Sequence, residues 1–268
     1  MSIPPDLDWR LVEKSIEECI RKAVEDSGAK GVVLGLSGGV DSSVCAVLSA
    51  RALGPERVTG LIMPDRESSR ENIDDAIMVA EHLGINYIIM DITGVVEAII
   101  RLFGHSYESA DKVAKGNVKA RARMTILYYY ANTMKKLVVA SSNRSEYLLG
   151  YFTKWGDAAG DLYPILSLYK TQVRKLAKHL GLPEKIVNKP STPDLWPGHR
   201  ASDELGADYD VLDKILYLLV DKQETFKKTA EIAGVPEKLV EQVWDMINKS
   251  VHKRYPLKTC SIPGKVIC

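Results

Sequence analysis

The sequence GLSGGVDSS at residues 35–43 joins an apolar run, residues 31–36, to a helix-like segment, residues 44–53. A glycine-rich turn from strand into helix gathers free backbone N–H groups and the positive end of the helix dipole at one point. That combination suits an anion, and because Gly38 and Gly39 carry no Cβ, the main chain can approach phosphate oxygens closely. The stretch therefore predicts a phosphate-binding loop between a strand and a helix.

The side chains of this loop add polar groups of two kinds. Ser37, Ser42 and Ser43 offer hydroxyls, and Asp41 offers a carboxylate that can hold Mg²⁺. The lysine of the G-x-x-x-x-G-K-[ST] loop is missing, which excludes the loop of the ordinary kinases and GTPases. Serine and glycine before a helix also serve as simple N-terminal caps, so a purely structural turn is the alternative interpretation.

The segment SGGVDSS, residues 37–43, resembles the pyrophosphate-binding loop of the ATP pyrophosphatases. Enzymes of this superfamily split ATP into AMP and pyrophosphate and use the adenylyl group to activate a carboxylate or carbonyl oxygen. Asparagine synthetase, GMP synthetase, NAD synthetase and several tRNA-modifying enzymes share the loop. The resemblance implies ATP chemistry and leaves the second substrate open.

The chain has 268 residues and a net charge of +1, from 36 basic and 35 acidic side chains. This balance gives no reason to expect a nucleic acid or a membrane as partner. No apolar run approaches the roughly 20 residues that cross a bilayer, and the N-terminus lacks the basic and apolar regions of a signal peptide. Cys19, Cys45, Cys260 and Cys268 form no C-x-x-C pair. We expect a single domain, residues 1–268, in the reducing cytoplasm.

Strand-like and helix-like segments alternate along most of the chain. The sequence predicts strands at residues 31–36, 57–63, 85–90 and 137–140, and helices at residues 12–24, 44–53, 71–83, 95–103, 117–134 and from about 145. This alternation indicates an α/β fold: a doubly wound parallel sheet, within residues 29–182, with helices on both faces. Ligands of such sheets bind beyond the carboxyl ends of the strands, where we expect the phosphate loop, Met63-Pro64 and Ser141-Ser142 to meet.

The pattern changes after residue 183. Residues 189–206 hold three prolines and two glycines among polar residues and are too long for an ordinary connection, so we expect a mobile lid over the site. Helices are expected at residues 208–219, 225–233 and 236–249, followed by the basic tail His252-Lys253-Arg254. Residues 208–256 thus form a helical C-terminal part.

Basic side chains recur in GNVKARARM at residues 116–124. Lys119 and Arg123 lie four residues apart on one helix face, whereas Arg121 points elsewhere. Taken alone, this pattern is typical of a basic helix face exposed to solvent. By contrast, residues 143–157 combine carboxylates, an ammonium group, aromatic rings and glycines, which indicates a binding surface.

Together these motifs resemble one member of the superfamily, the ammonia-dependent NAD synthetases. The family pattern reads SGGxDS, GNxxARxRM, an Asn-Arg-Ser-Glu turn, GYFTKxGDxxxDxxP, and a lysine before Q-V-x-x-L-A-x-x-L-G. The chain carries these motifs in that order at residues 37–42, 116–124, 143–146, 150–164 and 170–181. The match covers roughly residues 8–256, and five motifs in one order are highly specific.

The resemblance implies an adenine nucleotide alpha hydrolase-like fold and a role for each matching position. ATP would bind to Gly35, Leu36, Ser37, Gly38, Gly39, Val40, Asp41, Ser42, Ser141, Lys170 and Thr192. Asp41 and Glu146 would hold Mg²⁺, and Asp41 and Lys170 would be catalytic. Deamido-NAD would bind to Arg121, Lys154, Asp161, His252 and Lys253. The family has Gly-Thr where this chain has Ala140-Ser141; serine keeps the hydroxyl, but alanine cannot adopt a positive φ at low cost.

The implied reaction is ATP-dependent amidation of deamido-NAD by ammonia, the last step of NAD biosynthesis. It proceeds through an acyl-adenylate and releases AMP and pyrophosphate. The implied partners are ATP, deamido-NAD and ammonia, with a symmetric homodimer as the expected assembly and a separate glutaminase subunit left open. Asp157 and Asp161 are the candidates for removing a proton from ammonium.

Two other functions are compatible with the phosphate loop. One is a tRNA-modifying pyrophosphatase, for which a stronger basic balance or paired catalytic cysteines would be typical. The other is an adenine-nucleotide-sensing module on the same fold, which would not need both Asp41 and Glu146. His105, His179 and His199 show no metal-ligand spacing and receive no role.

Overall fold

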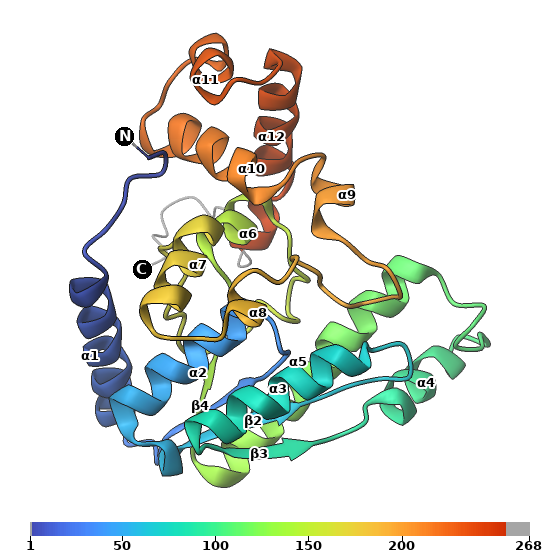
Figure 1. The fold of residues 1–268 in the computed structure, drawn as a ribbon. Coiled ribbons are helices and arrows are strands. Elements are labelled where there is room, and N and C mark those ends of the chain that lie inside the picture. Colours follow the sequence, from blue (N-terminus) through green and yellow to red (C-terminus); the bar gives the residue numbers. More distant parts are fainter. Residues whose placement is uncertain (1, 256–268) are drawn as a thin grey trace, which may run out of the picture.

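The computed structural model describes residues 2–255, and its centre is a sheet of four parallel strands (Figure 1). The strands are β1 (Val32–Gly35), β2 (Val58–Ile62), β3 (Asn86–Ile89) and β4 (Leu137–Val139), in the spatial order β3-β2-β1-β4. Each strand lies within its predicted range. Because the chain adds β2 and β3 on one side of β1 and β4 on the other, the switch point lies between β1 and β4.

Alternate side chains of the central strand enter two different cores, as the period of two in a strand requires. Val32 and Leu34 belong to the core on one face and Val33 to the core on the other, and all three are fully buried. Val32 lies opposite Val58 of β2 and Leu137 of β4. A strand buried on both faces explains why the sequence here is a continuous apolar run.

Helices cover both faces of the sheet. The face of Val32 packs against α1 (Trp9–Ser27), α2 (Val40–Leu53), α3 (Arg70–Leu83), α7 (Lys170–His179) and α8 (Glu184–Val187). The face of Val33 packs against α4 (Thr93–Arg101) and α5 (Lys112–Met134), and a short turn, η1 (Pro55–Arg57), leads into β2. The doubly wound α/β architecture is therefore confirmed. None of the helices within residues 2–255 combines the length and the apolar composition that a membrane span requires.

Helix α5 begins five residues earlier than the sequence pattern predicts, at Lys112 instead of residue 117. Asp111 explains the difference, because its carboxylate accepts a hydrogen bond from the backbone N–H of Ala114 at 2.8 Å and caps the helix. Buried lysines in the first turns, Lys115 and Lys119, interrupt the apolar period of this helix. Hydrophobic spacing alone therefore misses its start.

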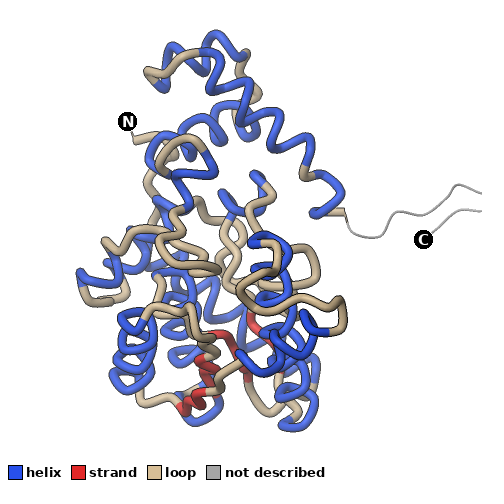
Figure 2. Tube along the Cα trace, turned by 90° about the vertical axis from the view of Figure 1, so that its right-hand side faces the viewer, coloured by secondary structure: helices blue, strands red, loops and turns tan. Residues whose placement is uncertain are grey.

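A helical part lies beyond the carboxyl edge of the sheet (Figure 1), and Figure 2 shows it stacked on the part that contains the strands. It consists of α6 (Arg144–Leu149), α9 (Ala201–Leu205), α10 (Tyr209–Leu216), η2 (Tyr217–Asp221), α11 (Phe226–Ala233), α12 (Glu237–Lys249) and α13 (Val251–Arg254). Leu212, Ile215, Val240 and Val243 are fully buried at its centre. The three longer helices α10, α11 and α12 fall where the sequence predicted them. Cys260 and Cys268 lie outside the described residues.

Residues 189–206, called the cover segment from here on, connect the end of α8 to the start of α10 and pass over the carboxyl edge of the sheet (Figure 1). The sequence predicted a flexible loop or lid at these residues. The cover segment instead contains the short helix α9, which Gly206 ends with a φ of 78°. The remaining residues of the segment form neither helix nor strand.

Candidate active site

A cavity of about 600 Å³ lies beyond the carboxyl ends of β1, β2 and β4. Its walls come from the phosphate loop, from Met63-Pro64 after β2, from Ser141-Ser142 after β4, and from the cover segment. Residues of α5 and of the segment 150–159 also contribute to the lining. Segments that are far apart in the sequence thus meet at the predicted edge of the sheet.

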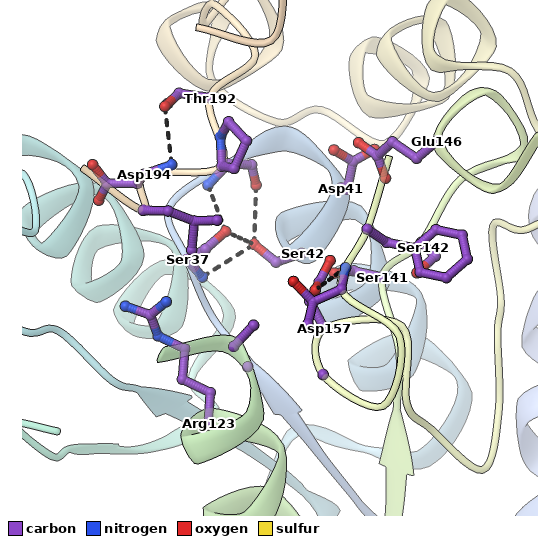
Figure 3. Close-up of a pocket in the computed structure, with 18 of the residues that line it drawn as sticks. Ser37, Asp41, Ser42, Arg123, Ser141, Ser142, Glu146, Asp157, Thr192 and Asp194 are labelled. Carbon is purple, nitrogen blue, oxygen red and sulfur yellow. Dashed lines mark hydrogen bonds between the residues drawn. The ribbon is translucent and has the colours of Figure 1, made fainter. Parts of the chain in front are cut away.

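The phosphate loop is held in a tight bend by its own serines (Figure 3). The two hydroxyls of Ser37 and Ser42 lie 3.0 Å apart, and the backbone N–H of Ser37 donates to the Ser42 hydroxyl oxygen at 3.2 Å. Ser42 in turn donates to the carbonyl oxygen of Gly39 at 3.1 Å. Within the described residues no side chain caps the start of α2 at Gly39, so the first N–H groups of this helix stay available to a ligand.

Gly38 is the residue that this bend requires. Its φ is +74°, and a Cβ at this position would lie 2.2 Å from the carbonyl oxygen of Asn72 on α3. Glycine alone therefore fits, both for backbone conformation and for space. Gly38 itself does not line the cavity, whereas the other residues of 35–42 do.

Three ionisable side chains converge beside the phosphate loop. Lys170, at the start of α7, forms an ion pair with Asp41, and its Nζ lies 3.4 Å from Oε1 of Glu146. Asn143 Nδ2 donates to the second oxygen of Asp41 at 3.0 Å. Because one ammonium group contacts both carboxylates, their oxygens face a common point, and Figure 3 shows Asp41 and Glu146 side by side. The loop and Glu146 therefore form one site, as the predicted metal pair requires.

The donor set of this site fits Mg²⁺, which takes oxygen ligands and binds proteins through one or two carboxylates together with substrate phosphates. Burial raises the pKa of Glu146 to about 7; the Lys170 ammonium opposes this shift and the Asp41 carboxylate adds to it. Burial lowers the pKa of Lys170, but the two carboxylates outweigh burial and hold it above its usual value. A crowded carboxylate pair of this kind favours a bound cation.

The other predicted ATP contacts also line the cavity. Ser141 does so from the turn after β4, Lys170 from the start of α7, and Thr192 from the cover segment. Ala140 is not among the described non-glycine residues with positive φ, and its backbone N–H donates to Leu162 at 2.9 Å. Alanine in place of the family's glycine therefore costs no backbone strain here.

The predicted dinucleotide contacts divide into two groups. Lys253 lines the cavity, and its Nζ donates to the carbonyl oxygens of Gly150 and Phe152 at 2.7 and 2.8 Å. The other four, Arg121, Lys154, Asp161 and His252, lie outside the cavity lining. Arg121 donates to the carbonyl oxygen of Lys154 at 3.2 Å, and Asp161 accepts from the Val138 N–H at 2.8 Å and from the Tyr128 hydroxyl at 3.2 Å.

The sequence did not assign Arg123 to the site, yet Arg123 lines the cavity on the same side as Ser37 (Figure 3). Its Nε donates to the carbonyl oxygen of Met63 at the end of β2, at 2.9 Å, and burial lowers the pKa of its guanidinium. The expectation of a solvent-exposed basic face is wrong for Lys119, which is fully buried. The spacing of four residues between Lys119 and Arg123 does indicate that they share a helix face. Whether that face is buried depends on packing against distant segments, which the spacing does not show.

Asp157 lines the cavity, whereas Asp161 does not. The backbone N–H of Thr153 donates to Oδ1 of Asp157 at 2.8 Å. Protein surrounds this carboxylate although it is open to the cavity, and the resulting desolvation raises its pKa. Of the two aspartates considered for accepting a proton, Asp157 is the one that faces the cavity.

The cover segment contributes an aromatic pair, Trp196 and His199; the sequence suggested Trp196 for closing the lid. His199, which was given no role, is buried and stacks on Trp196 with ring centroids 3.6 Å apart. Its Nε2 lies 2.8 Å from Glu204, which also accepts from the Tyr151 hydroxyl at 2.6 Å. All four side chains line the cavity.

A sequence model of the family described as NAD synthase matches residues 12–256. The chain belongs to the NAD synthase family. The NH(3)-dependent NAD(+) synthetase of Hyperthermus butylicus is 51% identical over 250 residues, which are 93% of this chain and 90% of that protein. The enzyme of the same name from Methanocaldococcus jannaschii is 45% identical over 91% of this chain and 93% of its own length.

Solved structures of NAD synthases and of a related enzyme share the fold. The NH3-dependent NAD synthetase of Campylobacter jejuni, in complex with the nitrate ion, superposes with a TM-score of 0.79 at 33% identity, over 96% of this chain and 99% of that one. The NMN synthetase of Francisella tularensis superposes with a TM-score of 0.83 at 31% identity, over 97% and 100%. The resemblance stated from the motifs is confirmed, and with it the family's parallel-sheet fold.

Proposed function

We propose that the protein catalyses the ATP-dependent amidation of deamido-NAD by ammonia. The observation that carries the proposal is the convergence of Asp41, Glu146 and Lys170 on one point beside an uncapped phosphate loop. Membership of the NAD synthase family and the names of the relatives support it. They favour this reaction over a tRNA-modifying enzyme and over a nucleotide-sensing module.

The chemistry explains why a nucleotide is needed. A carboxylate resists attack by ammonia because its oxygen is a poor leaving group. In the first step the nicotinate carboxylate oxygen bonds to the α-phosphorus of ATP, and the bond to pyrophosphate breaks. In the second step the ammonia nitrogen bonds to the carboxyl carbon, and AMP leaves with the electron pair of the broken C–O bond.

The residues of the cavity match these two steps. The N-terminus of α2 and the hydroxyl of Ser37 would receive the departing pyrophosphate, and Lys170 would stabilise the charge that grows on it. Mg²⁺ held by Asp41 and Glu146 would neutralise further phosphate charge. Asp157, a cavity carboxylate with a raised pKa, would take the proton that ammonium loses before attack.

A homodimer is part of the proposal. Tyr129 on α5 is 75% exposed, Trp155 is 52% exposed, and Leu102 and Phe103 after α4 are 82% and 76% exposed. Arg121, which belongs to the expected dinucleotide contacts, lies on α5 outside the cavity. A second copy against α5 would cover the aromatic side chains and complete the dinucleotide site. Light scattering after size-exclusion chromatography should give twice the chain mass; a monomer at micromolar concentration would contradict this part.

Nicotinic acid mononucleotide is a second candidate substrate. The observation that favours it is the similarity to the NMN synthetase of Francisella tularensis over 97% of this chain. Both substrates carry the same nicotinate carboxylate, so the adenylation chemistry of the cavity suits either. They differ in the adenosine part, which the predicted dinucleotide contacts would bind.

One assay tests both candidates. The protein is incubated with ATP, Mg²⁺, ammonium and either deamido-NAD or nicotinic acid mononucleotide, and AMP and the amidated product are measured. We expect AMP and NAD in equal amounts, with a higher kcat/KM for deamido-NAD. AMP formation that depends on neither acid would overturn the proposed function, and a higher kcat/KM for the mononucleotide would replace it by the second candidate.

A further inference from the structure

One stripe of α5 contacts the cover segment along its length. Lys112, Gly116 and Lys119 follow one another at a spacing of four and three residues and therefore share a helix face. The Nζ of Lys112 lies 4.2 Å from the ring centre of Trp196. A Cβ at Gly116 would lie 3.2 Å from Leu195 Cδ1 and 3.4 Å from Trp196 Cζ3, so glycine lets the cover segment approach closely.

Lys119 is the polar contact of this stripe. Its side chain is fully buried, and its Nζ donates to the carbonyl oxygen of Leu195 in the cover segment at 2.8 Å. The same Nζ forms ion pairs with Asp65 at 2.6 Å and with Glu67 at 2.7 Å. Two of these contacts, to Glu67 and to the Leu195 carbonyl, are hydrogen bonds, and the Asp65 carboxylate adds a buried ion pair. A buried ammonium is costly unless it is paired and fully hydrogen-bonded, so this geometry is strongly fixed.

The two carboxylates belong to the connection between β2 and α3, residues 63–69. Asp65 is fully buried and also accepts from the Tyr107 hydroxyl at 2.6 Å. The backbone N–H of Ser69, at the end of this connection, donates to Asp194 of the cover segment at 3.3 Å. Lys119 therefore joins three segments that each line or flank the cavity: α5, the connection after β2, and the cover segment.

We propose that Lys119 is a positioning residue that holds the cover segment over the cavity and thereby keeps water away from the acyl-adenylate. The inference rests on the proposed function. An acyl-adenylate reacts with water as well as with ammonia, and water attack would release AMP without forming the amide. Closing a site is the general means of suppressing such a side reaction. Lys119 does this through the Leu195 carbonyl, without touching the reacting atoms.

Lys115 offers a matched control. It is buried in the same cluster, pairs with Glu67 at 2.9 Å and donates to the Tyr107 carbonyl oxygen at 3.2 Å. Its hydrogen bonds and ion pairs do not include the cover segment. Lys115→Met therefore removes a buried charge of the same kind while leaving the contact to Leu195 in place.

The experiment measures AMP and NAD from the same reaction for the full-length wild type, Lys119→Met and Lys115→Met. We expect Lys119→Met to release several-fold more AMP than NAD, whereas the wild type and Lys115→Met release equal amounts. A second readout is the rate of tryptic cleavage after the exposed Arg200 in the presence of ATP and Mg²⁺. Cleavage should be several-fold faster in Lys119→Met only.

Equal amounts of AMP and NAD from Lys119→Met, or the same excess of AMP from Lys115→Met, would overturn the inference. If Lys119→Met does not fold, Gly116→Ala replaces it, because the added Cβ would lie 3.2 Å from Leu195 Cδ1 and crowd the cover segment without changing the ion pairs of Lys119. Gly116→Ala is then expected to release excess AMP, and its failure to do so would overturn the inference. If the wild type forms no NAD, the proposed function fails. The cleavage rates of the wild type and Lys119→Met would then still test whether Lys119 holds the cover segment in place.

Discussion

At the residue scale, the site depends on charges that neutralise one another before any ligand arrives. Lys170 contacts Asp41 and Glu146, and the ring centre of Tyr209 lies 5.5 Å from its Nζ. The carboxylates raise the pKa of Lys170, so the ammonium form persists at neutral pH despite burial. A fixed cation beside a phosphate loop stabilises charge on a leaving pyrophosphate without rearrangement during the reaction.

Asp41→Asn tests the metal pair. The amide keeps the shape of the side chain but loses the charge that holds a cation, so turnover should fall by about 10²-fold or more. AMP formation is measured over a range of Mg²⁺ concentrations, and thermal unfolding shows whether the fold is kept. Asp194→Asn changes another cavity carboxylate outside the pair and should keep the wild-type Mg²⁺ dependence. Near-normal turnover of Asp41→Asn would mean that the metal assignment is wrong.

Asp157→Asn separates the two chemical steps. Adenylation does not need the base, so exchange of labelled pyrophosphate into ATP should persist, while NAD formation should fall by about 10²-fold. Asp161→Asn is the matched control, because Asp161 lies in the same motif but outside the cavity. It should change the KM for deamido-NAD rather than the amidation step. Loss of both exchange and NAD formation in Asp157→Asn would argue against a role specific to ammonia.

At the element scale, the phosphate loop takes its shape from α3 as well as from its own sequence. The carbonyl oxygen of Asn72 lies 2.2 Å from the position that a Cβ of residue 38 would take, and Lys189 of the cover segment donates to the Gly38 carbonyl oxygen at 3.3 Å. Lys189 also pairs with the buried Asp75 of α3 at 2.5 Å. Helix α3 and the cover segment therefore both restrain Gly38.

Gly38→Ala should be destabilising, because alanine at a φ of +74° is strained and its Cβ meets a backbone carbonyl that cannot move freely. We expect a loss of about 2 kcal/mol or more in the free energy of unfolding. Gly39→Ala is the control: its φ is −91°, and its Cβ would lie 3.4 Å from the Ser37 hydroxyl. Urea denaturation of both variants checks the prediction, and equal stability of the two would refute it.

At the scale of the whole molecule, one buried carboxylate connects the helical C-terminal part to the active site. Asp213 of α10 accepts from the Ser145 hydroxyl at 2.5 Å and from the Thr171 backbone N–H at 2.8 Å. The Ser145 oxygen also accepts from the Lys170 backbone N–H at 2.9 Å. Through these bonds α10 fixes the starts of α6 and α7, which carry Glu146 and Lys170.

Asp213→Asn should change the pH dependence of stability. Burial raises the pKa of Asp213 to about 6 from a usual value of 3.8, so between these values the folded protein holds a proton that the unfolded chain has lost. Stability due to this group therefore falls as pH rises from about 4 to about 6, by about 3 kcal/mol, and is constant above. Asparagine does not titrate, so the stability of the variant lacks this decrease between about pH 4 and pH 6. The free energy of unfolding of Asp213→Asn relative to wild type should rise across that window; a difference independent of pH would contradict this account.

The local chemistry of the sequence was sufficient for the elements and for the centre of the site. Strands buried on both faces appear as apolar runs in the sequence. A glycine-rich turn between a strand and a helix, such as the one that contains Gly38, is typical of phosphate binding. These features depend on neighbours within a few residues, so the pattern predicted the four strands, the parallel sheet and the edge at which ligands bind. The order of five motifs was enough to indicate the family.

Packing between distant segments decided the rest. Lys119 and Arg123 look like solvent-exposed cations in the sequence, but Asp65, Glu67 and Met63 lie more than fifty residues away and bury or bind them. His199 gained a place in the cavity only because the cover segment folds back over the sheet. A local pattern records which face of an element is apolar, whereas the partner of a buried charge is set by which segments the topology brings together. The sequence by itself therefore determined the sheet and the phosphate loop, and the tertiary structure decided which charged side chains became the site.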